Sequence, residues 1–203
     1  MKRAVSVLLS AALMLSVLTG CGKSGSVSKK NIPAEETAAS KKIALSDSGI
    51  TVDGAAISDD ETAAVYAAQD IVYYEEGQGV AYGAGTDADA HSQEEADAHT
   101  VVHITQPGTY TLSGTLSAGQ IAVDLGDGAE EDPEAVVTIV LDGVDITCTV
   151  APAIIFYRVY ECGSADMETA TQTVDTSAAG ANVVIADGTE NRVTGSHVAK
   201  IYK

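Results

Sequence analysis

From Ile43 onward the chain consists of short apolar runs that are separated by polar turn residues. The runs are rich in Val, Ile and Thr, which are typical of strands. Gly, Asp or Pro occupies most of the gaps, as in Gln106-Pro107-Gly108 and Asp142-Gly143. The pattern predicts an all-β chain with these strands: Ile50–Val52, Ile71–Tyr74, Val101–Ile104, Tyr110–Leu116, Gln120–Leu125, Val136–Leu141, Val144–Cys148, Ala153–Tyr160, Asn182–Ala186 and Val198–Tyr202.

Two segments depart from this pattern. A short helix is predicted from about Ala88 to Ala98, with Thr86 or Asp87 as its N-cap. The stretch between Cys162 and Gly180 is polar and rich in Thr and Ala, which predicts a long loop between strands.

The sequence also contains a faint internal repeat. Ile139–Gly143 and Val184–Gly188 both consist of an apolar triplet followed by Asp-Gly, at an offset of 45 residues. A repeat of roughly 22 residues, or its double, is typical of a β-solenoid in which each coil stacks on its neighbour. A β-sandwich with two similar hairpins explains two copies equally well, so the periodicity leaves both folds open.

The N-terminus has the pattern of an export signal. Lys2 and Arg3 precede the run Ala4–Val17, which contains only apolar and small residues. This run is too short to span a bilayer as a helix, because a span needs about 20 residues. We therefore predict a signal peptide over residues 1–20.

The residues that follow indicate a lipid anchor. Leu18-Thr19-Gly20-Cys21 resembles a bacterial lipobox, which predicts that Cys21 carries lipid on its sulfur and becomes the mature N-terminus. An ordinary secretory signal with an incidental cysteine is the alternative. Residues 21–42 have the composition of a flexible tether, and residues 43–203 form the predicted domain. The expected location is extracytoplasmic, with the chain anchored to the bacterial membrane.

Charge restricts the class of partner. The chain of 203 residues has a formal net charge of −18, and seven of its eleven basic residues precede residue 43. Residues 43–203 therefore carry four basic and 27 acidic side chains, a net charge of −23. This excludes nucleic acid as a natural partner, because phosphate binding needs clustered Lys and Arg. Bound cations would relieve the repulsion, and Ca²⁺ prefers carboxylate oxygens, so Ca²⁺ is the predicted cofactor.

The cysteines exclude two kinds of site. Cys21, Cys148 and Cys162 form no CxxC pair, so the chain holds no zinc ribbon or CxxC redox motif. In an exported chain Cys148 and Cys162 could form a disulfide or remain reduced. The sequence leaves both states open.

Two groups of acidic residues follow predicted turns. Asp142 and Asp145 flank the turn in LDGVDIT, while Asp187, Glu190 and Asn191 follow the matching turn in IADGTENRV. In stacked coils these oxygens would share one edge and supply part of the ligand set of Ca²⁺, although Asp-Gly is also common turn chemistry. A second group either binds a cation or forms a solvated loop: Asp124, Asp127, Glu130, Glu131, Asp132 and Glu134.

The predicted helix carries a third group of titratable residues. His91, Glu95 and His99 fall on one stripe of a single helix face. Two histidines and a carboxylate could hold Zn²⁺, but the sequence contains no HExxH motif. A helix that faces solvent is the preferred interpretation.

The strand Ala153–Tyr160 carries the candidate sugar-binding side chains. Alternation puts Phe156, Arg158 and Tyr160 on one face, and the charge of Arg158 indicates that this face points outward. Aromatic rings beside a cation suit stacking on pyranose rings and pairing with uronate carboxylates. The alternative is that the N-terminal strands or the loop at 163–179 cover this face.

Two stretches of the chain closely resemble a bacterial family. The run Ile104–Thr147, which includes GTYTLSGTL and VLDGVDIT, and the run Gly180–Thr194 resemble the carbohydrate-binding domain-containing proteins. The resemblance implies a right-handed parallel β-helix, similar in fold to pectate lyases, that binds Ca²⁺ and acidic plant polysaccharides such as polygalacturonate, or cellulose. Members generally continue with further coils, so we expect the β-helix of residues 43–203 to be incomplete at its C-terminus.

These observations together predict a non-catalytic, lipid-anchored protein of the cell surface that binds polysaccharide with the help of Ca²⁺. A structural or adhesion protein without sugar affinity is the first alternative. A Ca²⁺-dependent polysaccharide lyase is less favoured, because the predicted domain has only Arg158, Arg192, Lys200 and Lys203 as candidate bases. The sequence also shows no Ser/His/Asp or Cys/His grouping for nucleophilic catalysis.

Overall fold

The computed structural model describes residues 39–73, 91–163, 173 and 176–196. All described elements lie within the compact unit Glu35–Lys203. Cys21 and the predicted strand Val198–Tyr202 lie outside the described residues. Among the residues that are described, no helix is long and apolar enough to cross a membrane.

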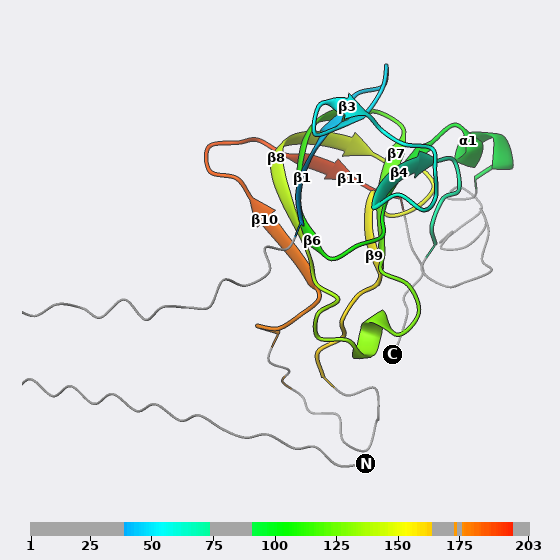
Figure 1. The fold of residues 1–203 in the computed structure, drawn as a ribbon. Helices are drawn as coiled ribbons and strands as arrows, with labels where there is room; N and C mark the ends of the chain where they lie inside the picture. Colours follow the sequence, from blue (N-terminus) through cyan, green and yellow to red (C-terminus); the bar gives the residue numbers. More distant parts are fainter. Residues whose placement is uncertain (1–38, 74–90, 164–172, 174–175, 197–203) are drawn as a thin grey trace, which may run out of the picture. The chain divides into compact units, whose positions relative to one another are not determined.

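The first sheet has seven strands in the order β10-β8-β6-β1-β2-β3, with β11 also paired to β8 (Figure 1). β1, β6, β8, β10 and β11 are parallel, whereas β2 and β3 fold back antiparallel. The bounds are β1 Ala39–Leu45, β2 Thr51–Val52, β3 Ala55–Ala56, β6 Gly108–Leu116, β8 Val137–Thr147, β10 Ala181–Ile185 and β11 Arg192–Thr194.

The second sheet has four strands in the order β4-β5-β7-β9. β5, β7 and β9 are parallel, and β4 runs antiparallel to β5. The bounds are β4 Val65–Ala68, β5 Thr100–Ile104, β7 Gly119–Asp124 and β9 Ile154–Arg158. The helix α1 (Gln93–Asp97) precedes β5, and the 3-10 helix η2 (Ala129–Glu131) lies between β7 and β8.

Side chains from both sheets form one hydrophobic core. Strands present alternate residues to opposite faces, so every second side chain points inward. Each fully buried Val, Leu or Ile stabilises the fold by about 1.5–3 kcal/mol relative to an exposed one. The buried strand residues of this core are Ile43, Leu45, Val65, Val102, Ile104, Tyr110, Leu112, Leu116, Ile121, Val123, Val137, Ile139, Leu141, Val144 and Ile146.

The expected right-handed parallel β-helix is wrong, although the all-β class agrees with the structure. Both sheets are mixed, because β2, β3 and β4 are antiparallel to their neighbours. The reason lies in the connections: a short turn can join only antiparallel strands, and β2 and β3 are joined by Asp53-Gly54. Both turn residues have positive φ, 52° and 84°, as a type I′ turn requires.

Asp142-Gly143 is a β-bulge inside β8 and not the predicted turn between two strands. Leu112 of β6 pairs with Leu141, but Gly114 pairs with Val144, so β8 contains one extra residue. Gly143 adopts the required positive φ of 77°. The bulge shifts the alternation by one residue, so Leu141 and Val144 both face the core.

Other boundaries also differ from the predictions. β1 begins at Ala39, inside the segment predicted as a tether. α1 begins at Gln93, and its N-cap is Ser92, whose side chain accepts a hydrogen bond from the Glu95 amide. Residues 71–73 of the predicted strand at 71–74 belong to no strand. The backbone of Val72 is instead hydrogen-bonded to the buried side chain of Gln120.

Gly114 provides a test of the contact between β1 and β6. It has a φ of 91°, and a Cβ at this position would overlap the carbonyl oxygen of Leu45. Gly114→Ala should therefore lower the free energy of unfolding by more than the roughly 1–2 kcal/mol that left-handed backbone costs a non-glycine residue. Gly128→Ala is the matched control, because Gly128 has a φ of 82° and open space around it. Equal losses in urea unfolding would contradict the close approach of the two strands.

Candidate functional site

The outer face of the second sheet carries a stacked pair of rings. Tyr66 of β4 pairs in register with His103 of β5, and their rings lie 4.5 Å apart with an angle of 4°. His103 Nε2 donates a 2.9 Å hydrogen bond to Asp70, whose side chain is 67% exposed. One face of the Tyr66 ring packs on His103. On its other side β4 is flanked by Ser58, which forms an isolated bridge with Tyr66 and accepts a 2.9 Å hydrogen bond from the Ala67 amide, and Tyr66 is half-buried.

On the same outer face, two strands away from β5, lies an arginine that is held by two carboxylates. Arg158 of β9 donates from Nε and Nη2 to the two Asp124 oxygens at 2.6 and 2.7 Å, and from Nη1 to Asp127. It also lies 5.7 Å from the ring centre of Tyr157. The hydrogen bond to Asp124 raises the pKa of the Arg158 guanidinium further above its ordinary range. Arg158 thus partly neutralises the acidic group around the 124–134 loop.

The charge of Asp124 also reaches Tyr66. Burial raises the pKa of Tyr66, with further contributions from Asp70, Glu61 and Asp124. In the sheet register, Tyr66 and His103 share a row with Ala122, and Asp124 comes two residues after Ala122 on the same side of β7. We call this set the outer-face patch; its members are Tyr66, Asp70, His103, Asp124 and Arg158.

The predicted sugar-binding face of β9 is divided by a bulge. Val123 pairs with Phe156 but Asp124 pairs with Arg158, so Tyr157 is an extra residue in β9. As a result Phe156 packs against the main core, while Arg158 bonds on the outer side. Tyr160 follows the end of β9 and is half-buried. Phe156, Arg158 and Tyr160 therefore do not share one face, because simple alternation does not hold across the bulge.

A segment of the chain covers the neighbouring part of the outer face. Ile71 and Val72 pack on a small cluster that includes Ile155. Gln120, which is fully buried, accepts a hydrogen bond from the Val72 amide at 2.8 Å and donates to the Val72 and Pro152 carbonyl oxygens at 2.9 Å. This segment, which belongs to no strand, thus covers the outer face around Ile155.

Three of the five predicted Ca²⁺ ligands line one hollow. Asp145, Glu190 and Asn191 surround it together with Val144 and Arg192. The Asn191 amide oxygen accepts from the Val144 amide at 2.8 Å, which fastens the β10–β11 loop to the bulge of β8. Arg192 pairs in register with Asp145, so a cation of the protein already lies here.

The other two predicted ligands lie outside this hollow. Asp142 is exposed on the bulge, and Asp187 is in the loop that follows β10. Within the described ranges no group of three or more His, Cys, Asp or Glu side chains could hold a metal ion. The arrangement around Asp145 and Glu190 therefore supplies only part of the six to eight oxygens that Ca²⁺ takes.

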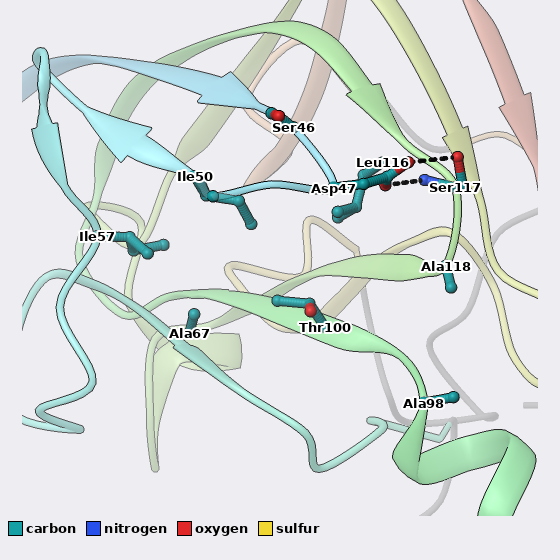
Figure 2. A pocket seen from close by; sticks show the side chains of 11 residues that line it. Ser46, Asp47, Ile50, Ile57, Ala67, Ala98, Thr100, Leu116, Ser117 and Ala118 are labelled. Carbon is teal, nitrogen blue, oxygen red and sulfur yellow. Dashed lines mark hydrogen bonds between the residues drawn. The ribbon is translucent and has the colours of Figure 1, made fainter.

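A separate hollow of about 390 Å³ opens beside the β2–β3 hairpin (Figure 2). Ile50, Ile57 and Leu116 form its apolar lining, and no sequence signal indicated it. At its rim Asp47 accepts hydrogen bonds from the amide and hydroxyl of Ser117, both at 2.7 Å. Both carboxylate oxygens are thus bonded within the fold, and Asp47 serves to connect the segment after β1 to the turn after β6.

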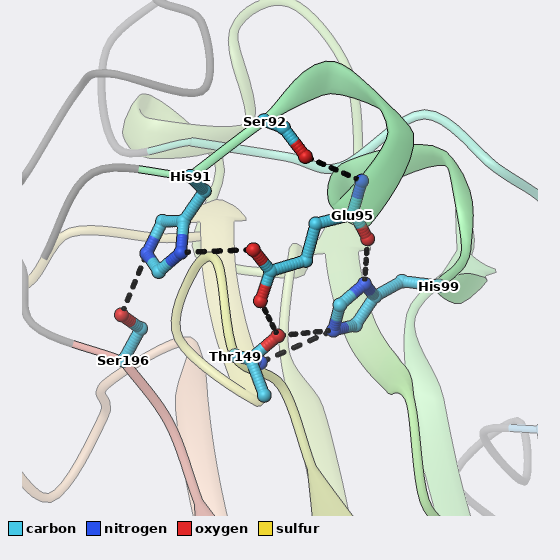
Figure 3. A network of polar contacts seen from close by, with 6 residues as sticks. All are labelled: His91, Ser92, Glu95, His99, Thr149 and Ser196. Carbon is cyan, nitrogen blue, oxygen red and sulfur yellow. Dashed lines mark hydrogen bonds and ion pairs between the residues drawn. The ribbon is translucent and has the colours of Figure 1, made fainter.

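The three titratable residues around α1 form a network with two other segments (Figure 3). His99 is buried; its Nδ1 donates to the Glu95 carbonyl oxygen at 2.8 Å and its Nε2 accepts from the Thr149 amide at 3.1 Å. Thr149 Oγ1 donates to the Glu95 carboxylate at 2.9 Å, and His91 Nε2 lies 3.1 Å from Ser196 Oγ. The prediction of a solvent-facing helix agrees with the exposed Glu95 and its helix neighbours but not with His99, which is buried. Both nitrogens of His99 are occupied, so this group connects segments and offers no free lone pair from His99 to a metal.

Cys148 and Cys162 are free thiols. Cys148 is buried, and burial raises the pKa of its thiol. The sequence left a disulfide and the reduced state open, and the structure favours the reduced state.

The comparisons with known proteins agree with the family resemblance. The chain belongs to the family of carbohydrate-binding domain-containing proteins, whose family model matches residues 98–201. A carbohydrate-binding domain-containing protein of Acetivibrio thermocellus is 56% identical over 48 residues. The match covers 24% of this chain and 15% of that protein, so this chain spans only a small part of its relative. No solved structure matches the chain.

Asp47 gives this region a pH-dependent contribution to stability. The hydrogen bonds from the Ser117 amide and hydroxyl lower the pKa of Asp47 below its ordinary value of 3.8. When a carboxyl group has a lower pKa in the folded than in the unfolded state, it stabilises the fold at pH values above the unfolded-state pKa. This stabilisation is lost as the pH falls through the folded-state pKa. Asp47→Asn should therefore be less stable than the wild type at pH 7, and the difference should shrink below a pH of about 3.8.

Urea unfolding at several pH values checks this expectation. Asp59→Asn is the control, because Asp59 is also exposed but its carboxylate makes no hydrogen bond within the described part of the chain. A stability difference for Asp47→Asn that stays constant between neutral and acidic pH would contradict the role of the carboxylate.

Proposed function

We propose that this protein is a non-catalytic carbohydrate-binding protein that holds polysaccharide on the outer face of the β4-β5-β7-β9 sheet. Membership of the family supports carbohydrate binding. The observation that carries the proposed site is the Tyr66–His103 stack, 4.5 Å between ring centres, beside the exposed Asp70 carboxylate. Sugar rings bind to this combination of an aromatic ring face and a hydrogen-bond acceptor.

Each member of the outer-face patch has a role in this proposal. The exposed part of the half-buried Tyr66 ring contacts the C–H face of a pyranose, and His103 supports the ring from behind. Asp70, fixed by His103, accepts hydrogen bonds from sugar hydroxyls. Arg158 uses three of its five N–H groups on Asp124 and Asp127, so two remain for a ligand oxygen.

The protonation state of Arg158 supports a binding role over a lyase role. A lyase that removes a proton beside a uronate carboxyl needs a base, and an arginine can serve only in its neutral form. The bidentate pair with Asp124 raises the pKa of Arg158, so this guanidinium stays protonated. Arg192 lies in a different hollow, next to Asp145.

Charge determines how an acidic glycan could bind. Residues 43–203 carry a net charge of −23, and Arg158 is already paired with two carboxylates. Direct binding of polygalacturonate would therefore place like charges together. We propose that Ca²⁺ is shared between Asp145, Glu190 and uronate carboxylates, which complete the ligand set that the protein alone leaves incomplete. Neutral glucan needs no such ion.

The proposed location follows from the N-terminus. A lipid on Cys21 would anchor the protein to the outer side of the bacterial membrane and present the outer-face patch to polysaccharide near the cell. Metabolic labelling with a fatty acid, with Cys21→Ala as the unlabelled control, tests this anchor.

The patch predicts a specific loss on substitution of Tyr66. Tyr66→Ala should weaken binding of the preferred neutral glycan roughly tenfold, because ring stacking is worth about 1 kcal/mol beyond the area that it buries. Tyr66→Phe should retain most of the affinity. A glycan array identifies the ligand, and titration calorimetry then measures the variants.

Tyr160→Ala is the matched control, because Tyr160 lies beyond the end of β9 and outside the patch. If Tyr66→Ala binds as well as the wild type, or if only Tyr160→Ala loses affinity, the proposed site is wrong. If the array shows no glycan at all, carbohydrate binding itself is wrong for this protein.

Binding of uronate should depend on Ca²⁺, whereas binding of neutral glucan should not. In affinity electrophoresis, polygalacturonate gels with Ca²⁺ should retard the protein, and a chelator should abolish the effect because charge repulsion then dominates. Asp145→Asn with Glu190→Gln should remove the Ca²⁺-dependent retardation, while exposed Asp59→Asn should not. Equal retardation with Ca²⁺ and with chelator, in protein that circular dichroism shows to be folded, would contradict the shared ion.

A further inference from the structure

The β10 and β11 edge of the first sheet exposes large apolar side chains. Val183, Val184 and Ile185 of β10 are 53%, 47% and 64% exposed, and Val193 of β11 is 45% exposed. These four are the exposed large hydrophobic residues among the residues that the structure describes. Apolar side chains that gather on one edge, unlike scattered ones, indicate an interaction surface.

The register explains why three of these side chains face the core side of the sheet. Val183 pairs with Ile139 and Ile185 pairs with Leu141, and both partners are core residues. Val193 likewise pairs with the buried Ile146. β10 and β11 therefore extend the row of core-facing side chains one strand beyond β8. The second sheet ends at β9 in the described part, so nothing there lies opposite to cover the row (Figure 1).

The backbone of this edge is also open to pairing. β10 pairs with β8 on one side and with no described strand on the other. The segment Ala181–Ala186 contains no charged residue and no proline, which are the usual devices that block edge-to-edge pairing. At the opposite edge, β3 has only two residues, both of them alanine.

We propose that β10 pairs with β10 of a second copy of this chain, in antiparallel orientation, and forms a two-fold symmetric dimer. Charge selects this arrangement. Asp187 and Glu190 both follow the C-terminal end of β10. A parallel pair would bring the two acidic loops together, whereas an antiparallel pair separates them by the length of the strand, about 3.3 Å per residue. An identical strand also offers apolar side chains on both faces, as β10 itself does.

The same charge predicts how the dimer responds to salt. The net charge of −23 on residues 43–203 opposes association of two copies. Added salt screens this repulsion and leaves the apolar contact in place. The dimer should therefore become tighter as ionic strength rises, opposite to an interface held by ion pairs.

Sedimentation velocity of residues 35–203, the compact unit that contains every described element, tests the proposal. We expect a monomer–dimer equilibrium that shifts to dimer with concentration and with salt. Val184→Lys should weaken association about tenfold, because in a two-fold dimer the exposed half of Val184 is buried in both copies, and the two halves together are worth about one full valine. This change also lowers the net negative charge, so greater repulsion between copies cannot explain a loss of dimer.

Ala55→Lys on β3 is the matched control, because it adds the same charge to the opposite edge of the same sheet. It should associate like the wild type. A wild type that stays monomeric, a Val184→Lys variant that associates as tightly as Ala55→Lys, or a series of open-ended oligomers would each overturn the proposal. Circular dichroism verifies that every variant is folded.

Cross-linking tests the orientation of the two strands. An antiparallel pair places Ala181 of one copy near Ile185 of the other, so Ala181→Cys protein mixed with Ile185→Cys protein should form the mixed disulfide. Each variant alone should cross-link less, since like positions are then far apart. Preferred cross-linking of like positions would show parallel pairing and overturn the antiparallel dimer.

Discussion

The structure depends on keeping the apolar side of every strand toward one shared core. A strand exposes an apolar side chain or buries a polar one wherever its alternation slips by one residue. Two bulges correct such slips. The bulge at Asp142-Gly143 keeps Leu141 and Val144 inside, and the extra residue Tyr157 allows Phe156 to face the core while Arg158 reaches the outer side.

The second bulge links the packing of the core to the chemistry of the surface. Without it, strict alternation would place Arg158 on the same side as Phe156, and an arginine without its partners inside the core would be strongly destabilising. With it, Arg158 meets Asp124 in a bidentate pair on the same outer face as Tyr66 and His103. Arg158 therefore belongs to the outer-face patch because the bulge in β9 keeps Phe156 packed against the core.

The sequence was informative where local rules apply. Alternation and turn residues located most strands, and two long motifs identified the family. The antiparallel directions of β2, β3 and β4 were not predicted, because they depend on which strand lies next to which in space. For the same reason Tyr66 and His103, which are far apart in sequence, carried no signal. The bulges were missed because Asp-Gly reads as a turn and Tyr157 reads as an ordinary strand residue. Three of the predicted ligands do line the hollow at Asp145. The sequence did not indicate that Arg192 lies beside them, because this depends on the pairing of β11 with β8.

The outer-face patch and the proposed dimer edge lie on different sheets, so neutral glycan can bind without the dimer, whereas the proposed Ca²⁺ hollow at Asp145 and Glu190 lies beside β10. An antiparallel β10 pair has its two-fold axis perpendicular to the first sheet, so the two second sheets lie on the same side of the joined sheet. Both outer-face patches then point in one direction. Two weak sites that face the same way can engage one polysaccharide chain together, and the second contact then forms at high effective concentration. Modest affinity at each Tyr66 would be sufficient for firm retention of a repetitive ligand.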